Sequence, residues 1–123
     1  MSEPGGPPCI GIVEDEKCLS DIYLKVFSKR GITVSFVARD GLQALELFES
    51  ANPRPRVLLM DQRIPHMSGV EVTRRILALD SGVRIIFISA DSDARDEALK
   101  AGAIAFIKKP ASLQVITDAV KNA

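Results

Sequence analysis

The chain alternates between short continuous runs of apolar residues and longer segments whose apolar residues recur with helical spacing. Continuous runs occupy residues 9–13, 57–60, 83–89 and 103–107. Such runs are typical of strands that are buried on both faces of a parallel sheet. Residues 32–38 alternate instead, with Ile32, Val34 and Phe36 separated by smaller or polar residues, which is typical of a strand with one wetter face. The pattern predicts five strands.

A segment with helical spacing follows each strand. Residues 17–30 carry Leu19, Ile22, Tyr23, Val26 and Phe27, which indicate one face of a helix. The expected helix boundaries are Asp40 as N-cap of the second helix, Ser68 with Glu71 as a capping box for the third, Ser92 as cap of the fourth, and Gly31 and Gly102 as helix ends. The residues expected to face inward on the later helices are Leu42, Leu45, Phe48, Val72, Ile76, Leu79, Ala94, Ala98, Ala101, Leu113, Ile116 and Val120.

Five strand–helix units in succession predict an α/β fold. We expect a single doubly wound parallel sheet of five strands in the order 2-1-3-4-5, covered by five helices. The length of 123 residues fits one domain, which we place at residues 9–123. Residues 1–8 are rich in Gly and Pro and are expected to form a disordered tail.

Composition narrows the function only slightly. Sixteen basic residues balance sixteen acidic ones, so charge gives no reason to expect direct binding of nucleic acid or of an anionic membrane. No apolar run is long enough to span a bilayer, and the cytoplasm is the expected location. Cys9 and Cys18 lack metal-ligand spacing, and we expect Cys9 to be a buried small apolar residue rather than half of a disulfide.

Polar residues gather where the predicted strands end. Glu14 and Asp15 follow the first strand, Asp61 the third, Ser89 the fourth and Lys109 the fifth. One polar residue at a strand end commonly just meets water. Four strand ends with this chemistry favour a site, because ligands of such sheets bind outside the carboxyl ends of the strands.

The residue types at this edge indicate a site for a metal and a phosphoryl group. Three crowded carboxylates repel one another, so they must either stay protonated or bind a cation, and their hard oxygen atoms suit Mg²⁺. A hydroxyl group and an ammonium group suit phosphoryl oxygens better than a metal. Asp61, at the centre, could itself accept the phosphoryl group as an acyl phosphate.

The sequence resembles the receiver domains of two-component response regulators over nearly its whole length. The motifs that carry the resemblance are EDE at 14–16, MD at 60–61 followed by Pro65 and Gly69, SA at 89–90, and GAIAFIKKP at 102–110. Each motif alone is weak, whereas their order and spacing together are highly specific. The resemblance implies the flavodoxin-like receiver fold.

The resemblance also implies roles for individual residues. Asp61 would accept a phosphoryl group from a sensor histidine kinase. Mg²⁺ would be held by Asp15, Asp61 and the backbone carbonyl of Arg63, with Glu14 acting through water. The phosphoryl oxygens would be held by Ser89, Lys109 and the amides of Arg63 and Ala90.

Signalling in this family would run from the site to one surface. Phe106 matches the aromatic residue that rotates inward when Ser89 moves, and the Lys109–Pro110 peptide would be cis. The surface of helix 4, strand 5 and helix 5 would then change for a downstream protein target or a fused output domain. The chain would be a phosphoacceptor in a phosphorelay rather than an enzyme, and a monomer or weak dimer. Both a stand-alone regulator and a piece of a longer protein remain open.

Two positions suggest a further hypothesis. Arg63 lies two residues after the acceptor, and Asp91 lies two residues after Ser89. They could pair across the opening of the site and slow the entry of hydrolytic water. The alternative is a pair of solvated loop charges that contribute little.

Three other classes of protein share features with this sequence. A dehalogenase-type phosphatase needs a second Asp two residues after the nucleophile, where this chain has Arg63. An FMN-binding protein needs a phosphate loop after the first strand, where Glu-Asp-Glu would repel phosphate. A pseudo-receiver that only binds partners is the main rival, although it would usually lack either Asp61 or Lys109. His66, the only histidine, is expected to be a surface loop residue.

Overall fold

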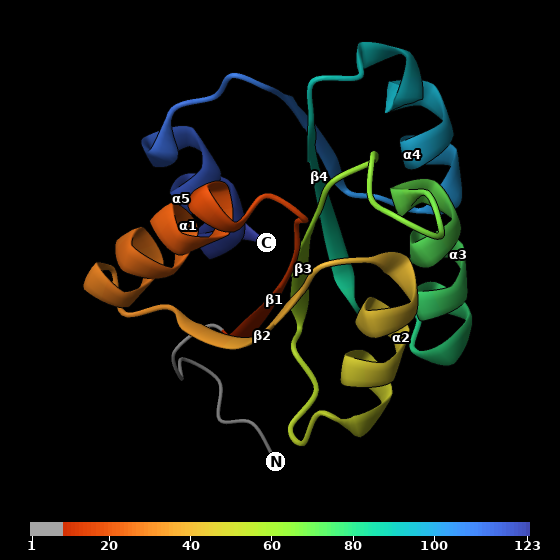
Figure 1. Cartoon of the computed structure of the whole chain (residues 1–123), viewed down its shortest axis with the longest axis horizontal. Coiled ribbons are helices and arrows are strands. Elements are labelled where there is room, and N and C mark those ends of the chain that lie inside the picture. The colour runs from red at the N-terminus through yellow and green to blue at the C-terminus, as the bar shows by residue number, and fades with distance from the viewer. Residues whose placement is uncertain (1–8) are drawn as a thin grey trace.

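The computed structural model describes residues 9–123 (Figure 1), so the tail expected at residues 1–8 lies outside the described part. The strands are β1 (Cys9–Val13), β2 (Thr33–Ala38), β3 (Val57–Met60), β4 (Arg84–Ser89) and β5 (Ala105–Lys108). The helical segments are α1 (Lys17–Lys29), α2 (Gly41–Ser50), α3 (Gly69–Leu79), the 3-10 turn η1 (Ser92–Ala94), α4 (Arg95–Ala101) and α5 (Leu113–Asn122).

The five strands form one parallel sheet in the order β2-β1-β3-β4-β5, as predicted. Helices α1 and α5 cover one face of the sheet, and α2, α3 and α4 cover the other (Figure 1). Both faces are therefore sealed by apolar side chains, which is why the central strands consist of continuous apolar residues. All four residues of β3 are buried, with Leu58 and Met60 on one face and Val57 and Leu59 on the other.

Strand β2 departs from the predicted alternation. Ile10 pairs with Val34 but Gly11 pairs with Phe36, so Ser35 forms a bulge that the partner strand skips. An extra residue reverses the faces beyond it. Ile32 and Val34 consequently pack with the α1–α5 layer, whereas Phe36 packs with the α2–α4 layer. The expectation that all three share one face was wrong for Phe36.

The prediction that certain helix residues face inward was also wrong at three positions. Ile22, Leu42 and Leu79 are exposed, at 44%, 53% and 48% respectively. Tyr23 and Phe27 of α1 and Phe48 of α2 are buried, as expected. The other buried residues of these two helices are Ser20 in α1 and Gly41 and Ala44 in α2. Leu79 is the last residue of α3, three positions after Ile76, which is the last buried residue of that helix. Cys9 is only half-buried rather than buried, and both cysteines are free.

The helix boundaries follow local chemistry at most of the expected positions. The Asp40 side chain accepts a hydrogen bond from the Gln43 amide at 2.8 Å, and Gly31 and Gly102 adopt positive φ at helix ends. Ser92 does not cap α4, because it lies inside the 3-10 turn η1 that precedes that helix. No helix within residues 9–123 is both long and apolar enough to cross a membrane.

The capping box expected at the start of α3 is only half formed. Ser68 Oγ accepts from the Glu71 amide at 3.2 Å, as expected. The Glu71 carboxylate, however, pairs with Arg74 and Arg75 on the next turn of the helix. The N-terminus of α3 therefore draws its remaining hydrogen-bond partners from elsewhere.

His66 is exposed, as expected, but its backbone has a positive φ of 72°. A residue with a Cβ is strained in this left-handed region, whereas glycine is not. We expect His66→Gly to raise the free energy of unfolding by about 0.5–1 kcal/mol, since relief of strain exceeds the added chain entropy. Urea denaturation checks this. His66→Ala keeps the Cβ and is the control, and an equal gain in both variants would contradict the strain argument.

Candidate functional site

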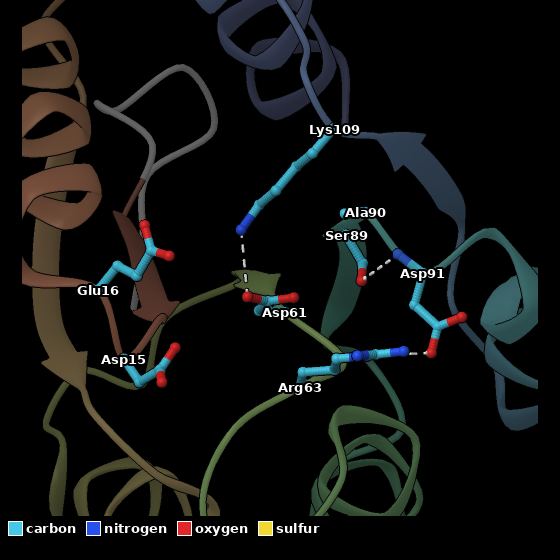
Figure 2. Close-up of a pocket in the computed structure, with 8 residues that line it drawn as sticks. All are labelled: Asp15, Glu16, Asp61, Arg63, Ser89, Ala90, Asp91 and Lys109. Atoms are coloured by element: carbon cyan, nitrogen blue, oxygen red, sulfur yellow. Dashed lines mark hydrogen bonds and ion pairs between the residues drawn. The ribbon is translucent and has the colours of Figure 1, made fainter.

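An open pocket of about 430 Å³ lies at the carboxyl ends of the strands. The residues that line it are Asp15, Glu16, Asp61, Arg63, Ser89, Ala90, Asp91 and Lys109 (Figure 2). Six of these residues were expected at the site, and the structure brings all six together. Glu14, the seventh, is fully buried against Lys109 and does not line the pocket.

Backbone hydrogen bonds of the sheet continue one residue beyond the strands and hold the site residues in place. The Asp61 amide donates to the Val13 carbonyl at 3.1 Å, and the Lys109 amide donates to the Ser89 carbonyl at 2.9 Å. The Glu14 amide donates to Ala38 at 3.0 Å. The sheet therefore sets the spacing of the charged side chains before those side chains interact.

The Lys109 ammonium group bridges two carboxylates from other strand ends. Its Nζ lies 2.9 Å from Glu14 Oε1 and 3.1 Å from Asp61 Oδ2. Burial by itself lowers the pKa of Lys109, but the Glu14 hydrogen bond and the charge of Asp61 outweigh it, so the pKa is raised. Lys109 therefore stays cationic beside Asp61.

Glu14 is the most buried of the three carboxylates. Burial raises its pKa, and the opposing hydrogen bond from Lys109 does not cancel that effect. Its second oxygen accepts a hydrogen bond from the Glu16 amide at 3.2 Å. Because both oxygens of Glu14 have partners, this carboxylate is poorly placed to bind a metal directly and better placed to act through water.

The acidic cluster fits a hard divalent cation. Glu14, Asp15 and Asp61 each offer a carboxylate oxygen, and these oxygens lie within 4.8 Å of one another. Asp15 is exposed, and within residues 9–123 nothing forms a hydrogen bond or ion pair with its carboxylate. Oxygen donors of this kind suit Mg²⁺. Asp15 and Asp61 are therefore the residues that could hold the ion directly.

The far side of the pocket carries the hydroxyl group and the Arg63–Asp91 pair. Ser89 is buried, and its Oγ accepts a hydrogen bond from the Asp91 amide at 3.1 Å. Arg63 Nε lies 3.6 Å from Asp91 Oδ2, with the Arg63 side chain 80% exposed (Figure 2). The pairing hypothesis is thus confirmed in geometry, although a pair this exposed contributes little stability.

The loop from β3 to α3 contains a residue to which the sequence analysis gave no role. The Gln62 amide donates to Asp61 Oδ1 at 2.8 Å, and the Gln62 carbonyl accepts from the Gly69 amide at 3.0 Å. The side-chain oxygen of Gln62 accepts from the Val70 amide at 2.9 Å. A contact eight residues away follows no local spacing rule, so no pattern in the sequence pointed to it.

The position of Gly69 next to Asp61 leaves no room for a side chain. A Cβ at this position would collide with the backbone oxygen of Asp61. Only glycine therefore lets the start of α3 approach the end of β3 so closely.

Arg39 is a second residue near the site that the sequence analysis missed. Its Nη1 donates to the buried Ser20 Oγ at 2.7 Å and lies 3.5 Å from the Glu14 carbonyl oxygen. It thereby links the end of β2 to α1 and to the loop that carries the acidic cluster. Glu16, at the pocket edge, was likewise given no individual role.

Two further expectations concern the region around β5. Phe106 is half-buried and stacks on Phe87, with ring centroids 6.2 Å apart. The Lys109–Pro110 peptide is cis, as expected.

Comparison with known proteins identifies the family. The model of the response regulator receiver domain matches residues 10–121, so the chain belongs to that family. Sporulation initiation phosphotransferase F of Bacillus subtilis is 35% identical over 113 residues, which cover 90% of this chain and 89% of that protein. The chemotaxis protein CheY of Thermotoga maritima is 30% identical, over 90% of this chain and 92% of that protein.

Solved structures agree with this assignment. The chain resembles the CheX–CheY–BeF₃–Mg complex from Borrelia burgdorferi, with a TM-score of 0.88 and 26% identity over 96% of this chain and 90% of that one. Some relatives are longer, and the chain spans 49% of the transcriptional regulatory protein CreB of Escherichia coli. The chain is therefore a receiver domain of the two-component response regulator family, the class its fold and site define.

The buried state of Glu14 gives a testable pH dependence. The folded protein holds the Glu14 proton to higher pH than the unfolded chain does, so ionisation costs stability as pH rises above about 4.3. Gln cannot ionise. We expect Glu14→Gln to gain stability relative to the wild type as pH rises toward neutrality, measured by urea denaturation in metal-free buffer.

Glu71→Gln is the matched control with the opposite sign. The hydrogen bond from Arg75 lowers the pKa of Glu71, so this carboxylate contributes stability above its unfolded pKa. Its replacement should lose stability relative to the wild type as pH rises. The same sign of change in both variants would contradict the burial argument.

Proposed function

We propose that Asp61 accepts a phosphoryl group from a sensor histidine kinase and that this chain acts as a phosphoacceptor rather than an enzyme with a separate substrate. The main support for this proposal is the position of the Asp61 carboxylate at the end of β3. It lies 3.1 Å from a cationic Lys109 and lines an open pocket together with Asp15 and Ser89. A nucleophile, a charge-neutralising group and room for a donor are thus combined.

Mg²⁺ is the cofactor that the acidic cluster supports. Asp15, Asp61 and the backbone carbonyl of Arg63 would hold the ion, and Glu14 would act through water. When bound, the ion supplies positive charge that offsets the negative charge of the phosphoryl oxygens. The magnesium and beryllofluoride in the Borrelia complex, at 26% identity, support this proposal.

The transfer forms one bond and breaks another. An Asp61 carboxylate oxygen attacks phosphorus, the phosphorus–nitrogen bond of the kinase phosphohistidine breaks, and its electron pair stays on the histidine nitrogen. Lys109 keeps its ammonium charge beside the new acyl phosphate. Ser89 Oγ accepts a hydrogen bond from the Asp91 amide, so its hydroxyl hydrogen can be donated to a phosphoryl oxygen. The backbone amides of Arg63 and Ala90 donate to the other phosphoryl oxygens.

The response to phosphorylation spreads through β4 and β5. Ser89 and Lys109 are joined by a backbone hydrogen bond, and Phe106 lies on β5 stacked against Phe87 of β4. Movement of Ser89 toward the phosphoryl group frees space for Phe106 and remodels the α4–β5–α5 surface. The partner there is a downstream protein or an output domain of a longer chain.

The Arg63–Asp91 pair controls hydrolysis of the acyl phosphate. The two side chains meet beside the pocket that both line (Figure 2). A guanidinium group held there restricts the in-line approach of water to the phosphorus atom.

Incubation with acetyl phosphate and Mg²⁺ is expected to add one phosphoryl mass to the protein, measured by intact mass spectrometry. Asp61→Asn should remain unmodified, because the amide nitrogen and oxygen are poor nucleophiles. Removal of Mg²⁺ with a chelator should also abolish the gain. The addition of beryllofluoride to the protein is a second readout that needs no chemical step.

Equal phosphorylation of the wild type and Asp61→Asn would place the acceptor elsewhere. A wild type that takes up neither phosphoryl nor beryllofluoride would favour the rival class, a pseudo-receiver that only binds partners.

Loss of the pair should speed dephosphorylation. We expect Arg63→Ala to shorten the lifetime of the acyl phosphate about two- to fivefold, the scale set by an exposed ion pair. Decay of the phosphorylated mass checks this. Arg75→Ala is the control, because Arg75 is also an exposed arginine in an ion pair but lies on α3, outside the pocket lining. An unchanged lifetime in Arg63→Ala would rule out the gate.

A further inference from the structure

We propose that Gln62 is a positioning residue of the phosphoacceptor site, which it fixes by joining Asp61 to the N-terminus of α3. This inference rests on the proposed function and deepens it. Gln62 uses three of its polar groups at once. Its backbone amide donates a hydrogen bond to Asp61 Oδ1, its backbone carbonyl accepts one from the Gly69 amide, and its side-chain oxygen accepts one from the Val70 amide.

These contacts complete the hydrogen bonding of the first turn of α3. The first four amides of a helix have no partner within the helix. Here Gly69 and Val70 donate to Gln62, while Glu71 and Val72 donate to Ser68. Since Val70 is only 2% exposed, a side chain without an acceptor at position 62 would leave its amide with little access to water.

The position of Gln62 in the chain gives these bonds a functional consequence. Gln62 lies between Asp61, the acceptor, and Arg63, whose backbone carbonyl and amide are proposed to contact the ion and the phosphoryl group. Because Gln62 is hydrogen-bonded to α3, the backbone of the next residue, Arg63, is held in a defined position. Because binding sites depend on positions held to a fraction of an ångström, a loosened Gln62 should weaken Mg²⁺ binding as well as the helix.

The coupling must also run in reverse. If the Gln62–Val70 bond favours the conformation that binds Mg²⁺, then bound Mg²⁺ must favour that bond. Exchange of the Val70 amide hydrogen with solvent should therefore slow when Mg²⁺ is added. This readout does not depend on phosphorylation.

The test compares Gln62→Met with Ser68→Ala. Methionine keeps the length of the side chain but lacks a strong acceptor. Ser68→Ala removes a side-chain hydrogen bond from the same helical turn and leaves the hydrogen bonds of Gln62 unchanged. Mg²⁺ affinity is measured by titration of amide chemical shifts, Val70 exchange is measured with and without Mg²⁺, and stability is measured by urea denaturation.

Both variants should lose stability, but only Gln62→Met should bind Mg²⁺ more weakly. We expect a loss of about three- to tenfold in affinity, the scale of one hydrogen bond, and faster Val70 exchange in the metal-free protein. Ser68→Ala should bind Mg²⁺ within about twofold of the wild type. Gln62→Glu, which keeps an acceptor oxygen, should restore Val70 protection, and high salt screens its added charge during the Mg²⁺ titration.

Wild-type affinity in Gln62→Met, or an equal loss in Ser68→Ala, would overturn the inference and leave Gln62 as a helix cap alone. If Gln62→Met does not fold, Gln62→Asn, whose amide group is one methylene shorter, takes its place under the same criteria. A wild type that binds no Mg²⁺ overturns the proposed function and this inference with it, so the two failures are distinguishable.

Discussion

The ammonium group of Lys109, held between Glu14 and Asp61, is the interaction on which the site depends. It joins the ends of β1, β3 and β5, three strands that arrive at the same edge of the sheet. Buried carboxylates without a partner would be costly, and a buried ammonium group without them equally so. The same contact therefore keeps the folded edge of the sheet intact and keeps a positive charge beside Asp61, the proposed acceptor.

The parallel sheet makes this convergence possible. All five strands present their carboxyl ends to one edge, and backbone hydrogen bonds from Asp61 and Lys109 extend the strand pairing to the site residues themselves. The loop after β3 is then constrained from two sides: Gly69 permits close approach to Asp61, and Gln62 binds the first turn of α3. A rigidly held Asp61 is thus combined with an open pocket, which is what the proposed phosphoryl transfer between two proteins requires.

Much of this arrangement could be predicted from the sequence, because the relevant signals are local. Continuous apolar runs located the strands, and the strand ends located Asp15, Asp61, Ser89 and Lys109 together. The missed features depend on contacts that no local pattern records. The bulge at Ser35 appears only when β2 is paired with β1, and the outward position of Leu42 depends on how α2 is rotated on the sheet. Gln62 meets Val70 across a turn whose path the sequence does not reveal.

A crystal structure with Mg²⁺ and beryllofluoride tests the central claim most directly, because it shows ligands atom by atom. The account predicts the ion bound by Asp15, Asp61 and the Arg63 carbonyl, and beryllofluoride attached to Asp61 within reach of Lys109 and Ser89. Beryllofluoride on another residue, or an ion that does not contact Asp15 and Asp61, would contradict it.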